Sequence, residues 1–231
     1  MFNSKDRFPG MLFDRRSVLL GTGAAVGSVA LSGASSGTAW AQSKIDEVAI
    51  DKLMAPGELP ELAQGPADAK VTIVEYASMS CPACARFHQT TYPKLKEKYI
   101  KTGKIRFIMR EFPLNNLAAA AAMLARCADT PGKSISLIDV LFEKQADWAT
   151  RNPVPELLKI AKQAGFTEKT FNACLENNEL LGKIARHRDK ADKEFGVDAT
   201  PSFFINGKRM RARNMTIEAF DKVLEPLLKS S

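Results

Sequence analysis

Two cysteines separated by two residues, in the order Cys81-Pro82-Ala83-Cys84, follow the apolar run at 71–76. A strand that ends in such a motif and continues as a helix is the local architecture of a dithiol redox site. Pro82 suits the first helical position, where its missing N–H costs nothing. Cys81 then lies at the helix N-cap, where free N–H groups and the helix dipole stabilise a thiolate. The motif therefore predicts thiol–disulfide exchange at Cys81 and Cys84.

Two other interpretations of this motif stay open. It can be half of a zinc site, because paired cysteines also bind tetrahedral metals. The second half is then missing, since the remaining cysteines and histidines are isolated along the chain: His88, Cys127, Cys174 and His187. It can also be a structural disulfide, although so short a loop constrains the unfolded chain very little. We favour the redox site and expect no metal and no cofactor.

Residues 1–41 read as an export signal peptide that is removed. Arg15-Arg16 precedes a weakly apolar stretch rich in Gly, Ala and Ser, which ends in the cleavage pattern Ala39-Trp40-Ala41. Paired arginines before such a stretch favour the twin-arginine route, although Ser17-Val18 departs from the usual signal. An uncleaved membrane anchor is the alternative, but the Gly, Ser and Thr content makes a poor spanning helix. We therefore expect export to the periplasm, where disulfides persist.

The chain carries a mild excess of positive charge, which by itself excludes few functions. Cleavage after Ala41 removes four basic and two acidic residues and lowers the net charge from +7 to +5. The densest basic cluster, residues 208–213, could face an acidic substrate or a membrane, but we interpret it as a solvated edge. Interleaved aromatic residues and a recognised nucleic-acid motif are both absent, so we expect no nucleic-acid binding.

The rest of the chain reads as one domain over 70–231, preceded by an extension at 42–69 that we expect to pack loosely. Periodicity and turn signals predict its elements in a fixed order. These are a buried strand at 71–76, a helix from Pro82 that kinks at Tyr92-Pro93 and stops at Gly103, a strand at 104–112 with one covered face, helices over about 115–195, a strand at 202–205 turning at Asn206-Gly207, and a helix at 215–228. The order predicts an α/β thioredoxin fold with a helical insertion after the second core strand.

With these elements in place, the chain resembles the DsbA family of periplasmic thiol:disulfide oxidoreductases from Ala69 to the C-terminus. The resemblance rests on the order and spacing of several motifs. They are Glu75 six residues before Cys81, the Cys-Pro-x-Cys site, Arg110-Glu111-Phe112-Pro113-Leu114, the helical insertion, and Thr200-Pro201 just before the hairpin. Each motif is modest by itself, but their arrangement is specific.

The resemblance implies roles for the residues around the dithiol. Pro201 is expected to be cis beside the sulfurs, with Thr200 offering backbone groups to an extended substrate; from sequence alone, an ordinary trans proline is the alternative. Glu75 is expected to be a buried acid that takes and returns the proton of Cys84, the alternative being a solvated carboxylate at the strand edge. For His88, one turn beyond Cys84, we expect a helix-face histidine with no chemistry.

Two departures from the family bear on redox strength. Ala83 stands where well-known oxidases carry His, and Thr200 stands where they carry Val. Ala83 cannot place positive charge near the Cys81 thiolate, so we expect an intermediate reduction potential. The working mechanism has a client thiolate attack an exposed Cys81 sulfur.

By resemblance, a quinone-linked membrane oxidase re-oxidises the protein, which we expect to be a monomer. The alternatives are a disulfide isomerase or reductase, and a non-catalytic copper-handling protein or chaperone on the same fold.

The two remaining cysteines, Cys127 and Cys174, both fall in the predicted helical insertion. In an exported protein, two leftover cysteines most simply pair with each other. We therefore expect a structural disulfide, the alternative being two separately buried thiols.

Overall fold

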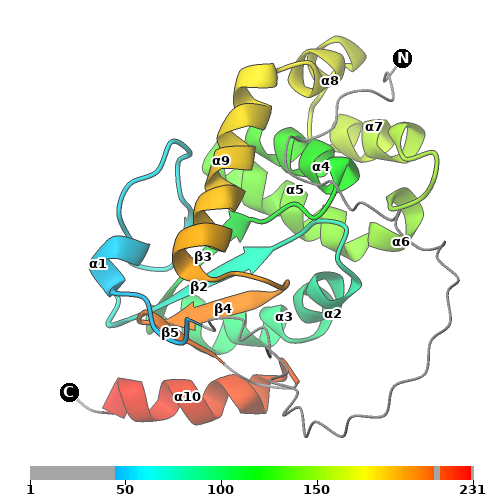
Figure 1. Ribbon diagram of the computed structural model, residues 1–231. Coiled ribbons are helices and arrows are strands. Elements are labelled where there is room, and N and C mark those ends of the chain that lie inside the picture. Colours follow the sequence, from blue (N-terminus) through cyan, green and yellow to red (C-terminus); the bar gives the residue numbers. More distant parts are fainter. Residues whose placement is uncertain (1–44, 211–213, 230–231) are drawn as a thin grey trace, which may run out of the picture. The chain divides into compact units, whose positions relative to one another are not determined.

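The centre of the protein is a sheet of five strands in the order β1-β3-β2-β4-β5, seen in a computed structural model that describes residues 45–210 and 214–229 (Figure 1). The strands are β1 (Leu62–Gln64), β2 (Val71–Ala77), β3 (Ile105–Glu111), β4 (Ser202–Ile205) and β5 (Lys208–Arg209). β2 and β3 run parallel, and the other pairings are antiparallel. This mixed sheet with its helices is the thioredoxin fold that the sequence predicts.

The two middle strands are buried on both faces. In β2, Ile73 packs into the larger apolar core on one face, whereas Val74 and Tyr76 pack into a second core on the other. The expectation that β3 has only one covered face is wrong, because Arg110 and Glu111 are 3% and 1% exposed. Each charge has a partner of opposite sign, Glu61 for Arg110 and Arg126 for Glu111, so neither is buried alone.

The helices after β2 follow the predicted pattern closely. They are α2 (Pro82–Thr90), α3 (Tyr92–Leu95) and the π-helical turn η1 (Lys96–Ile100). The break between α2 and α3 lies directly before Pro93, whose ring and missing N–H interrupt a continuous helix. The segment ends at Gly103, whose φ of 71° favours glycine.

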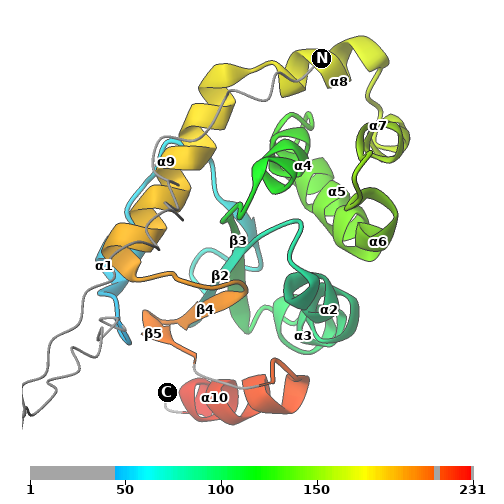
Figure 2. The same ribbon diagram turned by 45° about the vertical axis from the view of Figure 1, so that its right-hand side comes forward.

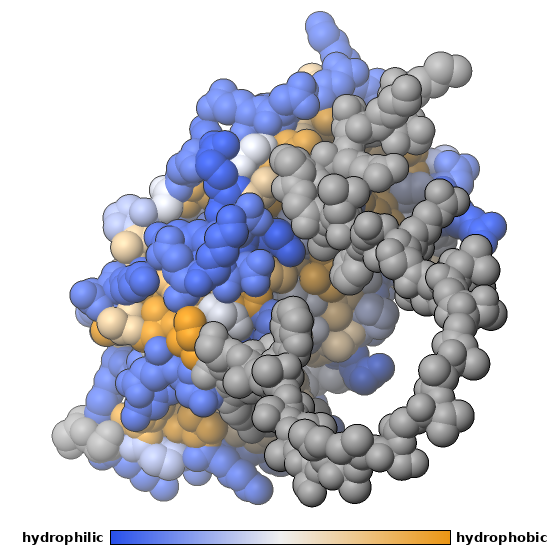
Figure 3. Space-filling view, in the orientation of Figure 1, coloured by the Kyte–Doolittle hydropathy of each residue, from blue (hydrophilic) through white to orange (hydrophobic). Residues whose placement is uncertain are grey.

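The helical insertion lies between β3 and β4. It consists of α4 (Asn116–Arg126), α5 (Pro131–Glu143), α6 (Gln145–Trp148), α7 (Val154–Gln163), α8 (Glu168–Leu175) and α9 (Asn178–Phe195). Figures 1 and 2 show α9 running from α8 back along the sheet to the start of β4. Hydrophilic residues cover its outer side (Figure 3), while Ala191 and Phe195 are buried against the sheet. The insertion therefore returns the chain to the sheet for its last strands.

The segment before β2 packs tightly, so the expectation of a loose extension is wrong. A short helix, α1 (Ile50–Leu53), buries Leu53, and β1 pairs with β3 at the edge of the sheet. Gly207, at the hairpin turn, also approaches this segment. A side chain there would meet the carbonyl oxygen of Val48 at 2.2 Å, and its φ is 86°. The close approach and the turn both require glycine.

The C-terminal helix α10 (Ile217–Lys229) closes the fold and buries Phe220 and Leu224 against the same core as α2. Helices thus cover both faces of the sheet, with α2, α3 and α10 on one and α9 on the other (Figures 1 and 2).

Several expectations concern residues that lie partly or wholly outside the described ranges. The export signal at 1–41 lies outside them, as do residues 211–213 of the basic cluster. Within the cluster, Lys208 is exposed as expected for a solvated edge. Arg209 is not, because its buried guanidinium donates to Asp198 at 2.6 Å and to the carbonyl oxygen of Gly196 at 2.7 Å. Among the described helices, none combines the length and apolar character needed to cross a bilayer.

Candidate active site

Cys81 lies at the N-cap of α2, in the loop that leaves the carboxyl end of β2. Its backbone is extended, with φ −81° and ψ 121°, and Pro82 occupies the first helical turn. The N–H groups of this turn therefore point toward the sulfur without intrahelical partners. Cys81 and Cys84 are both free thiols in the structure.

The environment of Cys81 favours its thiolate. Its pKa is lowered from 9.0 to about 5, chiefly by a hydrogen bond from the Cys84 thiol. The Thr200 hydroxyl and the backbone N–H groups of Cys84 and Ala83 lower it further, against the cost of burial. The expectation of an exposed sulfur is wrong, because Cys81 is only 8% exposed. Only a small part of Cys81 is therefore open to a client thiol.

Cys84 has the opposite environment. It is fully buried, and its pKa is raised, first by burial and then by Cys81 and the negative charge of Glu75. A thiol so placed stays protonated unless a base removes its proton. The site therefore pairs one stabilised thiolate with one protonated thiol.

Thr200 and Pro201 lie beside Cys81, and the peptide bond between them is cis. The thiol of Cys81 donates to the carbonyl oxygen of Thr200 at 3.3 Å. The buried hydroxyl oxygen of Thr200 has no hydrogen-bond partner among the described residues. It is free to donate to the Cys81 thiolate, which is how it lowers the pKa of that group.

Glu75 is fully buried in the middle of β2, between Met109 of β3 and Phe203 of β4. Its Oε2 atom lies 2.9 Å from Nε2 of His88. His88 does lie on a face of α2, as expected, but that face is buried and its side chain contacts Glu75. A sequence signal for this contact exists, because His88 follows Cys84 by four residues and so shares its face of α2.

Gln145 is a site residue that the sequence analysis missed. Its side-chain amide donates to the carbonyl oxygen of Met79 at 2.7 Å and to that of Cys81 at 3.0 Å. It belongs to α6, in the insertion, so no local pattern links it to the dithiol. The insertion thus contributes directly to the loop that carries Cys81.

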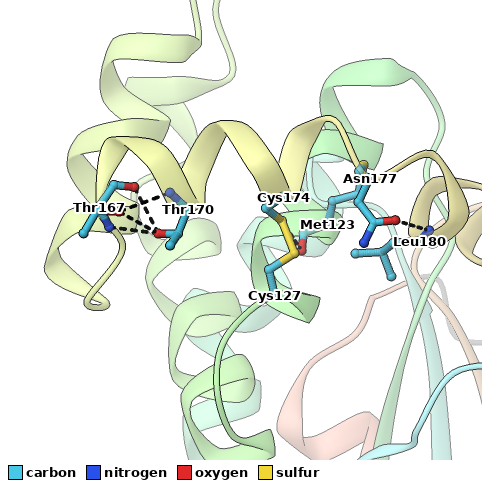
Figure 4. Close-up of a disulfide and its surroundings, with 7 residues drawn as sticks. All are labelled: Met123, Cys127, Thr167, Thr170, Cys174, Asn177 and Leu180. Atoms are coloured by element: carbon cyan, nitrogen blue, oxygen red, sulfur yellow. Dashed lines mark hydrogen bonds between the residues drawn. A yellow bond between two sulfur atoms is a disulfide. The ribbon is translucent and has the colours of Figure 1, made fainter.

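Cys127 and Cys174 form a disulfide in the structure, with a sulfur–sulfur distance of 2.18 Å and a Cα–Cα distance of 6.1 Å. Figure 4 shows Cys174 of α8 reaching across to Cys127 at the end of α4. The bond joins two helices of the insertion. In the described part of the chain, no group of three or more His, Cys, Asp and Glu side chains could hold a metal ion.

These features together define the class of thioredoxin-like dithiol proteins. They are a thioredoxin fold with a helical insertion, a low-pKa cysteine at a helix N-terminus, a buried second cysteine and an adjacent cis-proline. The family model described as thioredoxin matches residues 58–226. The chain belongs to the thioredoxin family and, within it, to the DsbA-like proteins.

Similar proteins carry redox names. A protein of Rickettsia bellii named "Putative protein-disulfide oxidoreductase" is 31% identical over 172 residues, covering 74% of this chain and 66% of the relative. A protein of Rickettsia typhi with the same description is 34% identical over 175 residues, which cover 74% of this chain and 64% of the relative. The chain thus spans just under two thirds of these relatives' length.

Solved structures agree with this assignment. The crystal structure of alpha-DsbA1 from Wolbachia pipientis superimposes with a TM-score of 0.71 at 28% identity, covering 78% of this chain and 96% of that one. BdbD from Bacillus subtilis, at 22% identity and a TM-score of 0.66, shares the fold.

Proposed function

We propose that this protein catalyses thiol–disulfide exchange on exported proteins through Cys81 and Cys84, with dithiol oxidation as its main activity. The observation that carries the proposal is the contrast between the two cysteines. Cys81 has a pKa lowered to about 5, whereas burial raises the pKa of Cys84. A stabilised thiolate makes the reduced form favourable, so the disulfide form is an oxidant.

The exchange begins with the Cys81–Cys84 disulfide. A client thiolate attacks the sulfur of Cys81, and a bond forms to it while the Cys81–Cys84 bond breaks. Cys84 leaves as a thiolate and takes up a proton. A second client thiolate then attacks the client sulfur of this mixed disulfide, and Cys81 departs as the stabilised thiolate. The client gains one disulfide and gives two electrons to the enzyme, and the proton on Cys84 comes from Glu75.

Three further residues are assigned roles in this exchange. Glu75 is buried beside Cys84, holds a proton while the Cys81–Cys84 disulfide is formed, and gives it to the departing Cys84 thiolate; the charge then left on Glu75 keeps the pKa of Cys84 raised. Thr200 and Pro201 bind an extended client segment, since the cis bond places the backbone of Thr200 beside Cys81. The Cys127–Cys174 disulfide has a structural role, and no cofactor is required.

The direction of exchange depends on the reduction potential. Ala83 offers no charge to the thiolate, but the Thr200 hydroxyl does stabilise it. We therefore place the potential between the extremes of the superfamily, which are about −120 mV for DsbA and about −270 mV for thioredoxin. A value near the lower extreme makes the protein a reductase, and one near about −180 mV is shared with isomerases.

The cellular setting follows from the same proposal. Residues 1–41 direct export to the periplasm by the twin-arginine route, and a quinone-linked membrane oxidase restores the disulfide. The protein acts as a monomer on reduced or wrongly oxidised clients.

The decisive experiment equilibrates the purified protein with glutathione buffers and then offers the oxidised form a peptide with two thiols. We expect an intermediate potential and stoichiometric oxidation of the peptide. Cys81→Ala abolishes both readings, whereas Cys127→Ala with Cys174→Ala keeps peptide oxidation. Failure of the wild-type protein to oxidise the peptide at any ratio overturns the proposed function. Stoichiometric copper retention by the reduced protein would then favour a copper-handling role.

A further inference from the structure

The buried contact between Glu75 and His88 is asymmetric. Oε2 of the carboxylate and Nε2 of the ring lie 2.9 Å apart, and the two side chains are 0% and 3% exposed. Oε1 of Glu75 and Nδ1 of His88 are equally buried but have no hydrogen-bond partner among the described residues. Buried polar atoms nearly always have partners, so two open atoms on one pair need an explanation.

The open ring nitrogen indicates the protonation of the pair. If Nδ1 carried a proton, a donor would be buried with nothing to accept from it, which is costly. The favoured state is therefore a neutral imidazole whose Nε2–H donates to Oε2. The carboxylate is then fixed by one hydrogen bond, and its second oxygen is left free to accept a proton.

Aromatic side chains fix the orientation of the His88 ring. Phe142 of α5 stacks on it, with ring centres 4.1 Å apart and planes 17° apart. Phe87 meets it edge-on at 5.2 Å, and Tyr92 lies against it at 4.8 Å. The ring is therefore held in one orientation by three neighbours, and Nε2 stays directed at Glu75.

We infer that His88 is a positioning residue for the exchange reaction, holding the Glu75 carboxylate by Oε2 so that Oε1 is left free to exchange a proton with the Cys84 thiol. The inference rests on the proposed function, because it concerns the step in which Cys84 gains or loses its proton. His88 has no other role in the exchange mechanism described above.

The proton balance is simple in both directions. When Cys84 resolves a mixed disulfide, its S–H proton passes to Oε1 of Glu75 and its thiolate attacks Cys81. The Cys81–Cys84 bond forms, and the client thiolate leaves. In the reverse direction, the protonated Glu75 returns the proton to the departing Cys84 thiolate. His88 keeps its own proton on Nε2 throughout and maintains the geometry of the acceptor.

The titratable groups that face this pair are few. Cys84 and Cys81 face it from α2, and Tyr92 faces it from α3, with its phenol bonded by the amide of Gln64. The nearest neighbours from β3, β4 and α5 are the uncharged Met109, Phe203 and Phe142, and the charge of Asp139 of α5 acts on the Tyr92 phenol. Burial raises the pKa of the Tyr92 phenol, so it stays protonated at neutral pH. The Tyr92 phenol therefore does not set the pH dependence of the exchange near neutral pH.

The test follows reduced protein mixed with excess oxidised glutathione, quenched with acid and read by peptide mass spectrometry. The first phase attaches glutathione to Cys81, and the second closes the Cys81–Cys84 disulfide. We expect His88→Phe to slow the second phase about tenfold to hundredfold, the range for one hydrogen bond to a charged group, and to change its pH profile. His88→Gln, which keeps a donor, should restore most of the rate. The first phase should change little in either variant.

The outcomes separate this inference from the proposed function. A second phase in His88→Phe with wild-type rate and pH profile overturns the inference, and the absence of any glutathione on wild-type Cys81 overturns the proposed function. His187→Gln is the matched control, because His187 lies on α9, on the opposite face of the sheet. If His88→Phe does not fold, nitrogen-15 spectra of His88 in the wild type and in Glu75→Gln decide. Identical titration curves in the two proteins overturn the inference.

Discussion

The side-chain amide of Gln145 donates to the backbone carbonyl of Cys81 at 3.0 Å, so a residue of the helical insertion binds the loop that carries the nucleophilic cysteine. The same amide also donates to the carbonyl of Met79 at 2.7 Å. One buried side chain thus donates to two carbonyl oxygens, of which that of Cys81 also accepts from the backbone N–H of Ala85. The insertion is therefore part of the site's construction as well as a cover for it.

Replacing Gln145 by Leu should destabilise the protein and loosen the loop. The buried carbonyl of Met79 loses its donor, at about 1–3 kcal/mol for an unsatisfied buried group, whereas the carbonyl of Cys81 keeps the N–H of Ala85. Urea unfolding of the oxidised protein measures the free energy, and the alkylation rate of reduced Cys81 reports the loop. Gln89→Leu is the matched control, because Gln89 also donates to two carbonyls, those of Phe142 and Glu143, but is itself exposed. Equal losses in both variants would contradict the argument.

The reactivity of Cys81 should depend on pH with a midpoint near its own pKa. In the reduced protein, iodoacetamide should modify Cys81 increasingly as pH rises through about 5, because only the thiolate reacts. Thr200→Val should shift this midpoint upward by removing the hydroxyl that lowers the pKa of Cys81. A midpoint near the ordinary value of 9.0 would contradict the assigned environment.

The same shift makes the stability of the reduced form depend on pH. The pKa of Cys81 is about 5 in the folded protein and 9.0 ordinarily, so between these values the unfolded chain binds more protons. We therefore compare the free energies of unfolding of the reduced and oxidised forms. The reduced form should gain stability relative to the oxidised form as pH rises above about 5, and this gain should be absent below about 5. Paired urea titrations measure the difference. They stay below about pH 8.5, where unfolded Cys84 begins to ionise. A difference independent of pH would contradict the prediction.

Features set by neighbouring residues could be predicted from the sequence, and features set by distant ones could not. The hairpin at Asn206-Gly207 was predictable because positive φ angles of 47° and 86° are a local demand that Asn and Gly meet. The N-cap position of Cys81 follows equally from Pro82. The partners of Glu75 and Cys81 in α2 and α6, by contrast, meet only when the chain folds. The polar–apolar alternation in β3 wrongly predicted a strand with one covered face, because Arg110 and Glu111 are buried and pair with residues far along the chain.

The ion pair between Arg126 and Glu111 allows a test of what a buried, unpaired charge costs in stability. Arg126 donates to Glu111 with Nη2–Oε2 at 2.7 Å, and their side chains are 6% and 1% exposed. Arg126→Met leaves the Glu111 carboxylate buried without its cation, which should cost about 3–5 kcal/mol in urea unfolding. The double variant Arg126→Met with Glu111→Met should cost clearly less, because no charge is then left alone. A double variant that loses as much as the single one would mean that packing, not charge, sets the cost.

The Cys127–Cys174 disulfide should contribute to stability without taking part in exchange. It closes a loop with a sequence separation of 47, for which the chain-entropy model gives about 4 kcal/mol as an upper value. Cys127→Ala with Cys174→Ala should lower the free energy of unfolding by up to this amount. Cys81→Ala with Cys84→Ala should change it far less, because their loop is only two residues long. Peptide oxidation should persist in the first double variant and vanish in the second. Loss of peptide oxidation in folded Cys127→Ala with Cys174→Ala would show that this bond serves the dithiol as well as the fold.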